Sequence, residues 1–87
     1  MLTRNMATEW AKYNIQINGI GPGYMRTELG ARPLSDPKVK SLLETLTPMR
    51  RPGEPDEMKG LAVFLASDAS GFITGQTVLI DGGYILW

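Results

Sequence analysis

The spacing of hydrophobic residues changes along the chain from a helical to a strand-like period. Leu2, Met6 and Trp10 recur every four residues, which predicts an amphipathic helix at the start of the chain. Asn14 follows the last of these positions, and asparagine is a common left-handed residue at the end of a helix. Apolar and polar residues then alternate, so we expect a strand over residues 15–20.

A second helix and a second strand follow in the latter half. Pro55 and its acidic neighbours suit the first turn of a helix, because proline lacks an N–H that would be unpaired there and carboxylates favour the positive end of the helix dipole. The apolar stripe from Met58 to Leu65 extends this helix, which we expect over residues 55–67. Residues 77–80 are nearly all apolar, as is typical of a strand covered on both faces.

The segment between these halves is less regular. Its apolar residues between Pro33 and Pro48 fit one or two short helices. The predicted fold class is therefore α/β, with two strands and about three helices arranged as part of a parallel sheet. Stable sheets usually have about three or more strands with a buried face, so we expect the chain to be incomplete alone.

Composition argues against several classes of function. Nine basic and nine acidic side chains give zero net charge, and no basic stripe predicts nucleic-acid binding. No apolar run approaches the roughly 18 to 20 residues that a membrane span needs. The chain has neither cysteine nor histidine, so we expect no metal site and no histidine general base. The absence of cysteine is compatible with a cytoplasmic protein.

A Pro-Gly pair after the first predicted strand marks the candidate ligand site. Pro22 presets φ and Gly23 accepts a positive φ, as the central positions of a type II turn require. In open α/β sheets ligands bind just beyond the carboxyl ends of the strands, so residues 22–27 lie where a cofactor would lie. Thr27 would either donate its hydroxyl to a ligand or cap a helix that starts at Glu28, and residue type alone favours the cap.

Other candidates have simpler interpretations. The glycines from Gly19 to Gly23 lack the sixth-position glycine of a dinucleotide fingerprint, so we expect them to shape a turn rather than bind phosphate. Arg50 and Arg51 would suit an anionic substrate, but adjacent loop arginines are more often solvated. Asp81 precedes two glycines, and we expect its carboxylate to bond the backbone of a turn.

Three segments of the chain carry a distinctive combination of motifs. The first runs N-I-Q-I-N-G-I-G-P-G-Y-M-R-T over residues 14–27, the second begins R-P-G-E-P-D-E at residue 51, and the third runs from G-F-I-T-G-Q at residue 71 to D-G-G at residues 81–83. In this order and spacing, the segments resemble the short-chain dehydrogenase/reductase family over essentially all of the chain. Residues 5–13 are most similar to the gluconate 5-dehydrogenase branch.

The resemblance implies that residues 1–87 are the C-terminal segment of one Rossmann-type domain, which has a doubly wound parallel sheet. It also implies NAD or NADP as the cofactor. Pro22 and Gly23 would line the nicotinamide ring, and Met25 would offer backbone groups to the carboxamide. Thr27 would offer its hydroxyl to the carboxamide, so the resemblance makes cofactor contact its preferred role.

The resemblance also shows what the chain lacks. The family's glycine-rich phosphate loop, catalytic serine and Tyr-x-x-x-Lys pair have no match here, so no catalytic residue is assigned. Residues 28–49 match the family's variable substrate-lid segment. We therefore expect a fragment of an NAD(P)-dependent oxidoreductase that interconverts a secondary alcohol and a ketone on a polyol or sugar acid such as gluconate. Alone, the chain is expected to be inactive.

A second interpretation is a truncated, non-catalytic binding or oligomerisation module that pairs with full-length relatives. Residues 55–67 and 77–87 match family surfaces used in dimer and tetramer contacts, so the resemblance implies a homo-oligomer. A third interpretation is that Met1 is an internal methionine of a longer reading frame.

Overall fold

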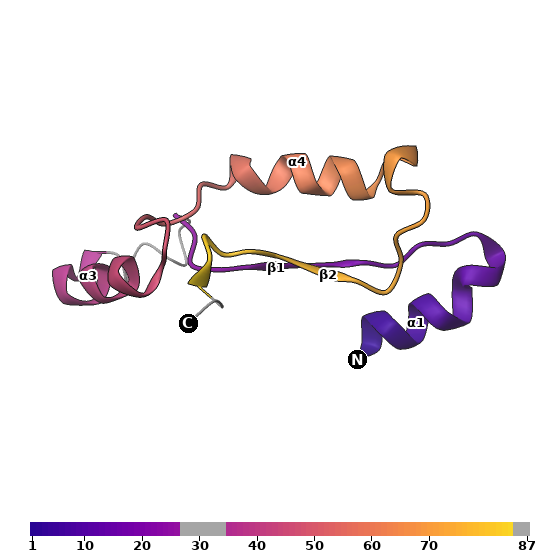
Figure 1. Ribbon diagram of the computed structural model, residues 1–87, viewed down its shortest axis with the longest axis horizontal. Coiled ribbons are helices and arrows are strands. Elements are labelled where there is room, and N and C mark those ends of the chain that lie inside the picture. The colour runs from indigo at the N-terminus through magenta and orange to yellow at the C-terminus, as the bar shows by residue number, and fades with distance from the viewer. Residues whose placement is uncertain (27–34, 85–87) are drawn as a thin grey trace.

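A parallel pair of strands organises the molecule. The computed structural model describes residues 1–26 and 35–84. In chain order, the elements are α1 (Leu2–Trp10), η1 (Ala11–Tyr13), β1 (Gly19–Pro22), α3 (Pro37–Leu46), α4 (Asp56–Leu65), η2 (Asp68–Ser70) and β2 (Thr77–Ile80). β1 and β2 pair in parallel, with Gly19 opposite Thr77 and Pro22 opposite Ile80. In Figure 1, α4 and α1 lie on opposite sides of the strand pair, and α3 lies beyond its carboxyl end.

The opening helix follows the predicted pattern. α1 starts at Leu2 without a side-chain cap at Met1, and the 3-10 turn η1 continues it to Tyr13. Asn14 then adopts a left-handed conformation with φ of 60°, and its N–H donates to the carbonyl of Ala11, so the predicted C-terminal cap is confirmed.

The first strand lies later in the sequence than predicted. The expectation of a strand over residues 15–20 is wrong at both ends, because β1 covers Gly19–Pro22. The preceding residues run beside residues 73–76, but side chains supply many of the bonds. The N–H of Ile17 donates to the hydroxyl of Thr74 at 3.1 Å, while the amide of Asn18 donates to one backbone carbonyl and accepts from one N–H of that segment. A regular ladder therefore begins only at Gly19.

The later elements agree more closely with their predicted ranges. α4 starts at Asp56 with Pro55 in the cap position, within a residue of the predicted start, and β2 lies over Thr77–Ile80 as predicted. α3 begins after Asp36, whose carboxylate accepts the N–H of Lys38 at 2.9 Å. This helix falls in the segment where one or two short helices were expected.

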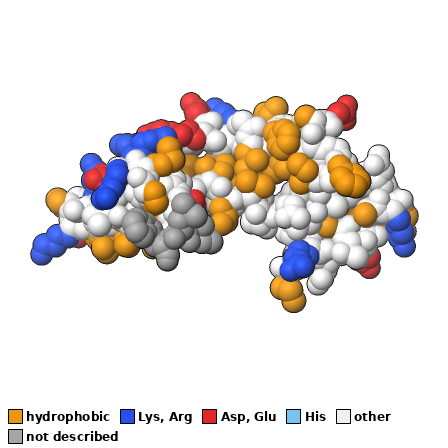
Figure 2. All heavy atoms as spheres, in the orientation of Figure 1, with side chains coloured by type: hydrophobic (Ala, Val, Ile, Leu, Met, Phe, Trp, Pro, Cys, Tyr) orange, Lys and Arg blue, Asp and Glu red, His pale blue; other side chains and the backbone are white. Residues whose placement is uncertain are grey.

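The strand pair is poorly covered by the described residues. The expectation that residues 77–80 are buried on both faces is wrong for this chain, because Val78 is 36% exposed and Leu79 is 45% exposed. The radius of gyration is 15.6 Å, whereas a compact domain of this length has about 12 Å. Figure 2 shows hydrophobic side chains gathered on the surface over α4 and the strands. The described residues therefore do not bury this sheet.

Candidate functional site at the carboxyl end of the strands

The ends of the two strands approach each other closely at Gly23. The N–H of Gly23 donates to the carbonyl of Ile80 at 2.8 Å, which continues the ladder one residue beyond β1. A Cβ atom on Gly23 would lie 2.8 Å from the Cα atom of Asp81. The predicted type II turn is wrong, because Gly23 is not among the glycines with positive φ. Glycine is required here for the close approach of two backbones.

The chain beyond Gly23 gains a second neighbour on its other side. The N–H of Gly53 donates to the carbonyl of Tyr24 at 3.1 Å, and the N–H of Arg26 donates to the carbonyl of Gly53 at 2.8 Å. These bonds form an isolated parallel bridge between Met25 and Gly53. Residues 24–26, which we call the strand extension, are thus held by Gly53 on the edge of the chain that faces away from β2.

The side chain of Met25 is buried, whereas its backbone N–H and carbonyl bond no other described residue. Its side chain is buried, with 8% exposed, and its sulfur lies 2.6 Å from where a Cβ atom on Gly53 would be. Successive residues of a strand direct their backbone groups to alternate edges. The N–H and carbonyl of Met25 therefore face the edge opposite Gly53, where β2 has already ended. No hydrogen bond joins them to another described residue.

The turn after β2 lies beside the strand extension, and Asp81 and Gly82 of this turn line the same pocket as Tyr24. Gly82 and Gly83 have φ of 62° and 91°, and the carboxylate of Asp81 accepts the N–H of Gly83 at 2.9 Å. The interpretation of Asp81 as a turn residue is therefore confirmed. The loop after α3 packs on this turn: Thr47 is buried, and the N–H of Met49 donates to the carbonyl of Gly82 at 3.1 Å.

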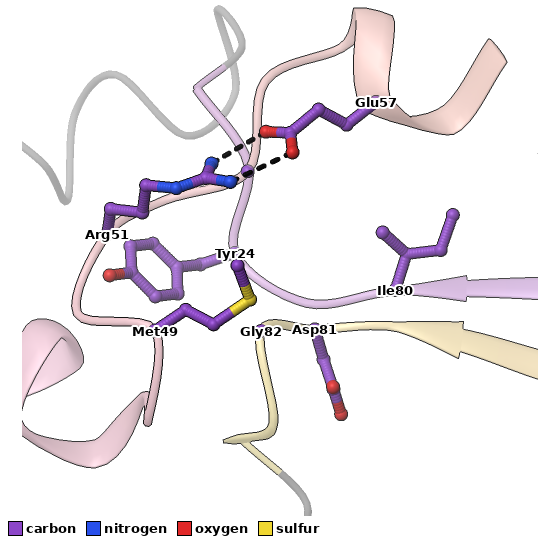
Figure 3. Close-up of a pocket in the computed structure, with 8 residues that line it drawn as sticks. Tyr24, Met49, Arg51, Glu57, Ile80, Asp81 and Gly82 are labelled. Carbon is purple, nitrogen blue, oxygen red and sulfur yellow. Dashed lines mark hydrogen bonds and ion pairs between the residues drawn. The ribbon is translucent and has the colours of Figure 1, made fainter. Parts of the chain in front are cut away.

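A small cavity of about 70 Å³ lies where these segments meet (Figure 3). Its lining residues are Tyr24, Met49, Arg51, Gly53, Glu57, Ile80, Asp81 and Gly82. Pockets for small molecules usually measure about 300 Å³ or more, so this cavity alone does not enclose a ligand. The side chain of Arg51 lines it and is joined to Glu57, which argues against Arg51 as a free anion ligand.

The Arg51–Glu57 ion pair has two bonds. The Arg51 Nη1 and Nη2 atoms donate to the two carboxylate oxygens of Glu57 at 2.6 and 2.9 Å. Together with the N–H of Glu54, this pairing lowers the pKa of Glu57 from 4.5 to about 2. The same hydrogen bonds and charge raise the pKa of Arg51. The carboxylate is therefore ionised at any physiological pH.

The structure places three of the four predicted cofactor contacts in succession at this strand end. Pro22 ends β1 and is exposed, Gly23 contacts β2, and Met25 lies in the strand extension. Thr27 lies outside the described residues, as does the start of the 28–49 segment. The partner that sequence reasoning missed is Gly53, although it belongs to the R-P-G-x-P-x-E pattern already singled out.

Two negative findings concern the described ranges 1–26 and 35–84. They contain no group of three acidic, histidine or cysteine residues placed to hold a metal ion. No helix within them is long and apolar enough to cross a membrane.

Comparisons with known proteins place this geometry in a family context. Residues 1–85 match the family profile described as enoyl-(acyl carrier protein) reductase. The 2-dehydro-3-deoxy-D-gluconate 5-dehydrogenase of Formosa agariphila is 47% identical over 91 residues, which cover 98% of this chain and 33% of that protein.

Two solved structures share the fold. The gluconate 5-dehydrogenase of Burkholderia cenocepacia, in complex with NADP and tartrate, has a TM-score of 0.96 and 46% identity over 100% of this chain and 34% of its own. A 4-hydroxyisoleucine dehydrogenase complexed with NADH has a TM-score of 0.95 and 36% identity over 99% of this chain and 35% of its own.

The chain thus spans about a third of the length of the relatives it matches. Its helices and parallel strands superpose on a Rossmann-type fold, and these relatives include complexes with NADP and with NADH. Both the profile match and the superpositions extend over nearly all of the chain. The chain belongs to the short-chain dehydrogenase/reductase family.

Proposed function

We propose that this chain supplies the nicotinamide-facing wall and the substrate-covering segment of an NAD(P)-dependent oxidoreductase. The enzyme would interconvert a secondary alcohol and a ketone on a polyol or sugar acid such as gluconate. Relatives named for gluconate and for a deoxygluconate, at 46% and 47% identity, support this substrate class. We expect the enzyme to work in the cytoplasm, with which the absence of cysteine from these 87 residues is compatible.

The backbone of Met25 is the observation that carries the proposal. A carboxamide has one acceptor oxygen and an NH₂ donor, and Met25 presents an N–H and a carbonyl on the same edge. Its buried side chain and the Gly53 bridge fix this edge before a ligand arrives. Pro22 and Gly23 would line the ring beside it, and Thr27 would add its hydroxyl. NAD and NADP share the nicotinamide, so these contacts do not choose between them.

The bound nucleotide supplies the hydride chemistry, and this chain supplies orientation. Anchoring the carboxamide fixes which face of the ring meets the substrate, which is the kind of positioning that accelerates a reaction. None of the three tyrosines is followed four residues later by lysine, so the proton donor would come from outside these 87 residues. Residues 28–49, which include α3, would cover the substrate.

A hybrid enzyme tests the proposal in a complete sheet. Residues 1–87 replace the matching segment of the Burkholderia gluconate 5-dehydrogenase, which is 46% identical to this chain. We expect the hybrid to bind NADP and to oxidise gluconate. A hybrid that folds, as judged by circular dichroism and a cooperative melt, but binds no NADP would refute the proposed role of the chain.

The isolated chain provides the complementary test. We expect the purified chain to show no turnover of NAD or NADP with gluconate or related polyols, because the catalytic pair is absent from its sequence. Measurable turnover by the chain alone would contradict the assignment of catalysis to residues outside it.

A second candidate function is supported by the exposed apolar surface. Val63 and Phe64 on α4 are 69% and 40% exposed, and part of β2 is exposed as well. In a non-catalytic module, residues 55–67 and 77–87 would pair with full-length relatives, with residues 85–87 outside the described part. Co-purification of the tagged chain with the full-length Burkholderia enzyme would favour this function. Lack of any complex, together with an active hybrid, would favour the first.

A further inference from the structure

The loop from Arg51 to Glu57 is closed on itself by its own side chains. The guanidinium of Arg51 bonds both carboxylate oxygens of Glu57, and its Nη1 also donates to the carbonyl of Pro52 at 3.2 Å. The Glu57 carboxylate in turn accepts the N–H of Glu54 at 3.0 Å, in the manner of a capping residue at the start of α4. Three separate contacts thus fix the backbone on both sides of Gly53.

Gly53 is the point at which this closed loop touches the strand extension. Both backbone groups of Gly53 bond to the extension, one on each side of Met25. A second ion pair joins the same two segments, from Arg26 Nε to a Glu54 carboxylate oxygen at 2.7 Å. The position of Met25 is therefore set by a loop whose own shape depends on Arg51 and Glu57.

We propose that Arg51 and Glu57 are positioning residues for the cofactor: their ion pair holds Gly53 in the place where it fixes the backbone of Met25. This inference rests on the proposed function, because it takes Met25 as a contact of the nicotinamide carboxamide. Neither side chain would need to contact the cofactor in this arrangement. The pair acts through Gly53, whose backbone bonds the strand extension on both sides of Met25.

The geometry of the pair distinguishes this role from ordinary surface charge. Exposed ion pairs contribute little to stability, and the Arg51 and Glu57 side chains are 46% and 41% exposed. A two-bond guanidinium–carboxylate contact nevertheless fixes relative orientation, which a single contact of a lysine does not. The Lys59–Asp56 pair of the same helix joins residues one turn apart, at 76% and 83% exposure, and touches no loop that reaches the site. It is the matched control.

The test uses the hybrid enzyme with the variants Arg51→Ala, Glu57→Gln, Arg51→Lys and, as the control, Lys59→Gln. The affinity for NADP is measured by fluorescence titration, and KM for gluconate is measured at saturating NADP. Amide hydrogen exchange is followed by NMR at Gly53 and Arg26, whose N–H groups form the bridge. A second hybrid in the 4-hydroxyisoleucine dehydrogenase, titrated with NADH, carries the same variants if the first does not fold.

We expect Arg51→Ala and Glu57→Gln to weaken nucleotide binding about tenfold. The reason is that a shifted Met25 backbone would no longer meet the nicotinamide carboxamide in the geometry that its hydrogen bonds need. KM for gluconate should change by less than about twofold, because the displaced backbone contacts the nucleotide and not the substrate. A general loss of stability would instead weaken the binding of both ligands. Exchange at Gly53 and Arg26 should accelerate in the same variants. Arg51→Lys, which keeps the charge and loses the two-bond contact, should restore part of the affinity, and Lys59→Gln should match the parent.

Two results would overturn the inference, and they differ from failure of the proposed function. Unchanged exchange at Gly53 and Arg26 in Arg51→Ala would show that the ion pair does not hold the bridge. Faster exchange with unchanged nucleotide affinity would show that the bridge does not position the cofactor. By contrast, an unsubstituted hybrid that folds but binds no nucleotide would refute the proposed function, and the inference that rests on it would fall too.

Discussion

At Gly23 and at Gly53, added side-chain atoms would meet neighbours of very different kinds. A Cβ atom on Gly23 would meet the backbone of Asp81, which directly follows β2 and is held by the turn bonds that it accepts from Gly83 and Tyr84. A Cβ atom on Gly53 would meet the thioether end of Met25, which is flexible and can rotate away. Gly23 is therefore the stricter requirement, although only Gly53 belongs to the positioning loop.

The substitution Gly23→Ala should lower the free energy of unfolding of the hybrid by about 1–3 kcal/mol, the usual range for overpacking. The control is Gly60→Ala in the middle of α4, where, apart from the adjoining helix backbone, no described atom lies within 4 Å of an added Cβ atom. Alanine there should raise the free energy of unfolding by about 0.5–1 kcal/mol, because glycine is a poor helix residue. Urea denaturation measures both, and equal effects of the two variants would contradict this account.

The sequence predicted the role of individual residues where local chemistry decides it. Asn14 and Asp81 each bond backbone atoms within three residues, and both were predicted correctly. Gly23 was assigned a positive φ because Pro-Gly is a common turn pair, but its conformation is set by Asp81, far along the chain. The partnership of Gly53 with Met25 was missed for the same reason, since no local pattern reveals it.

At the scale of elements, the two strands show why sequence periodicity placed one correctly and the other too early. β2 is a short apolar run between turn residues, and its limits coincide with that run. The alternation over residues 15–20 also describes an extended chain that is joined to residues 73–76 partly through side chains, those of Thr74 and of Asn18 itself. Periodicity reports which faces are apolar, and it cannot distinguish a backbone ladder from side-chain bonds that replace it.

Asn18 is the residue that joins the two extended segments before the ladder begins. Its side chain donates to the Ile73 carbonyl at 3.0 Å and accepts the Gln76 N–H at 3.1 Å. Asn18→Ala should therefore lower the free energy of unfolding of the hybrid by about 1–2 kcal/mol, from two lost hydrogen bonds. The control Thr8→Ala removes an exposed bond within α1 and should have little effect in the same denaturation experiment. A loss confined to Thr8→Ala would contradict the role given to Asn18.

The first turn of α4 should respond to acid through Glu57. Its pKa is lowered to about 2 in the folded protein from an ordinary 4.5, so its ionised form stabilises the fold above pH 4.5. That contribution should decrease as the pH falls through 4.5 and disappear near pH 2. The NMR titration of the Glu57 carboxyl carbon in the hybrid measures this pKa directly.

Glu57→Gln supplies the control for the acid response. This variant should be less stable than the parent at pH 7, and the difference should shrink as the pH falls toward 2. A carboxyl that titrates near 4.5 in the folded hybrid would mean that Arg51 does not hold it in solution.

At the scale of the whole molecule, the described part of the chain exposes many large apolar side chains. The described part buries few apolar side chains, and Phe72 is fully exposed. The principal extents of 49 × 23 × 21 Å describe an elongated body rather than a compact one. An unpaired strand edge together with exposed apolar residues favours association with another chain.

We therefore expect the isolated 87-residue chain to be partly unfolded or self-associated in solution. Circular dichroism should show a broad, non-cooperative melt, and gel filtration should give an elution volume that depends on concentration. The hybrid, in which the same residues complete a sheet, should melt cooperatively. A monodisperse monomer with a sharp melt would contradict this expectation and would show that two strands suffice here.

The parallel pairing of β1 with β2 also determines the order in which the parts of the chain fold. Contacts between these segments join residues as far as 58 positions apart, whereas each helix closes bonds between near neighbours. Local helices form within about a microsecond, but distant pairings wait until the intervening chain has closed into a loop. The carboxyl ends of β1 and β2, with the strand extension, are thus among the last parts to assemble. A ligand bound at these strand ends would therefore slow unfolding without accelerating folding.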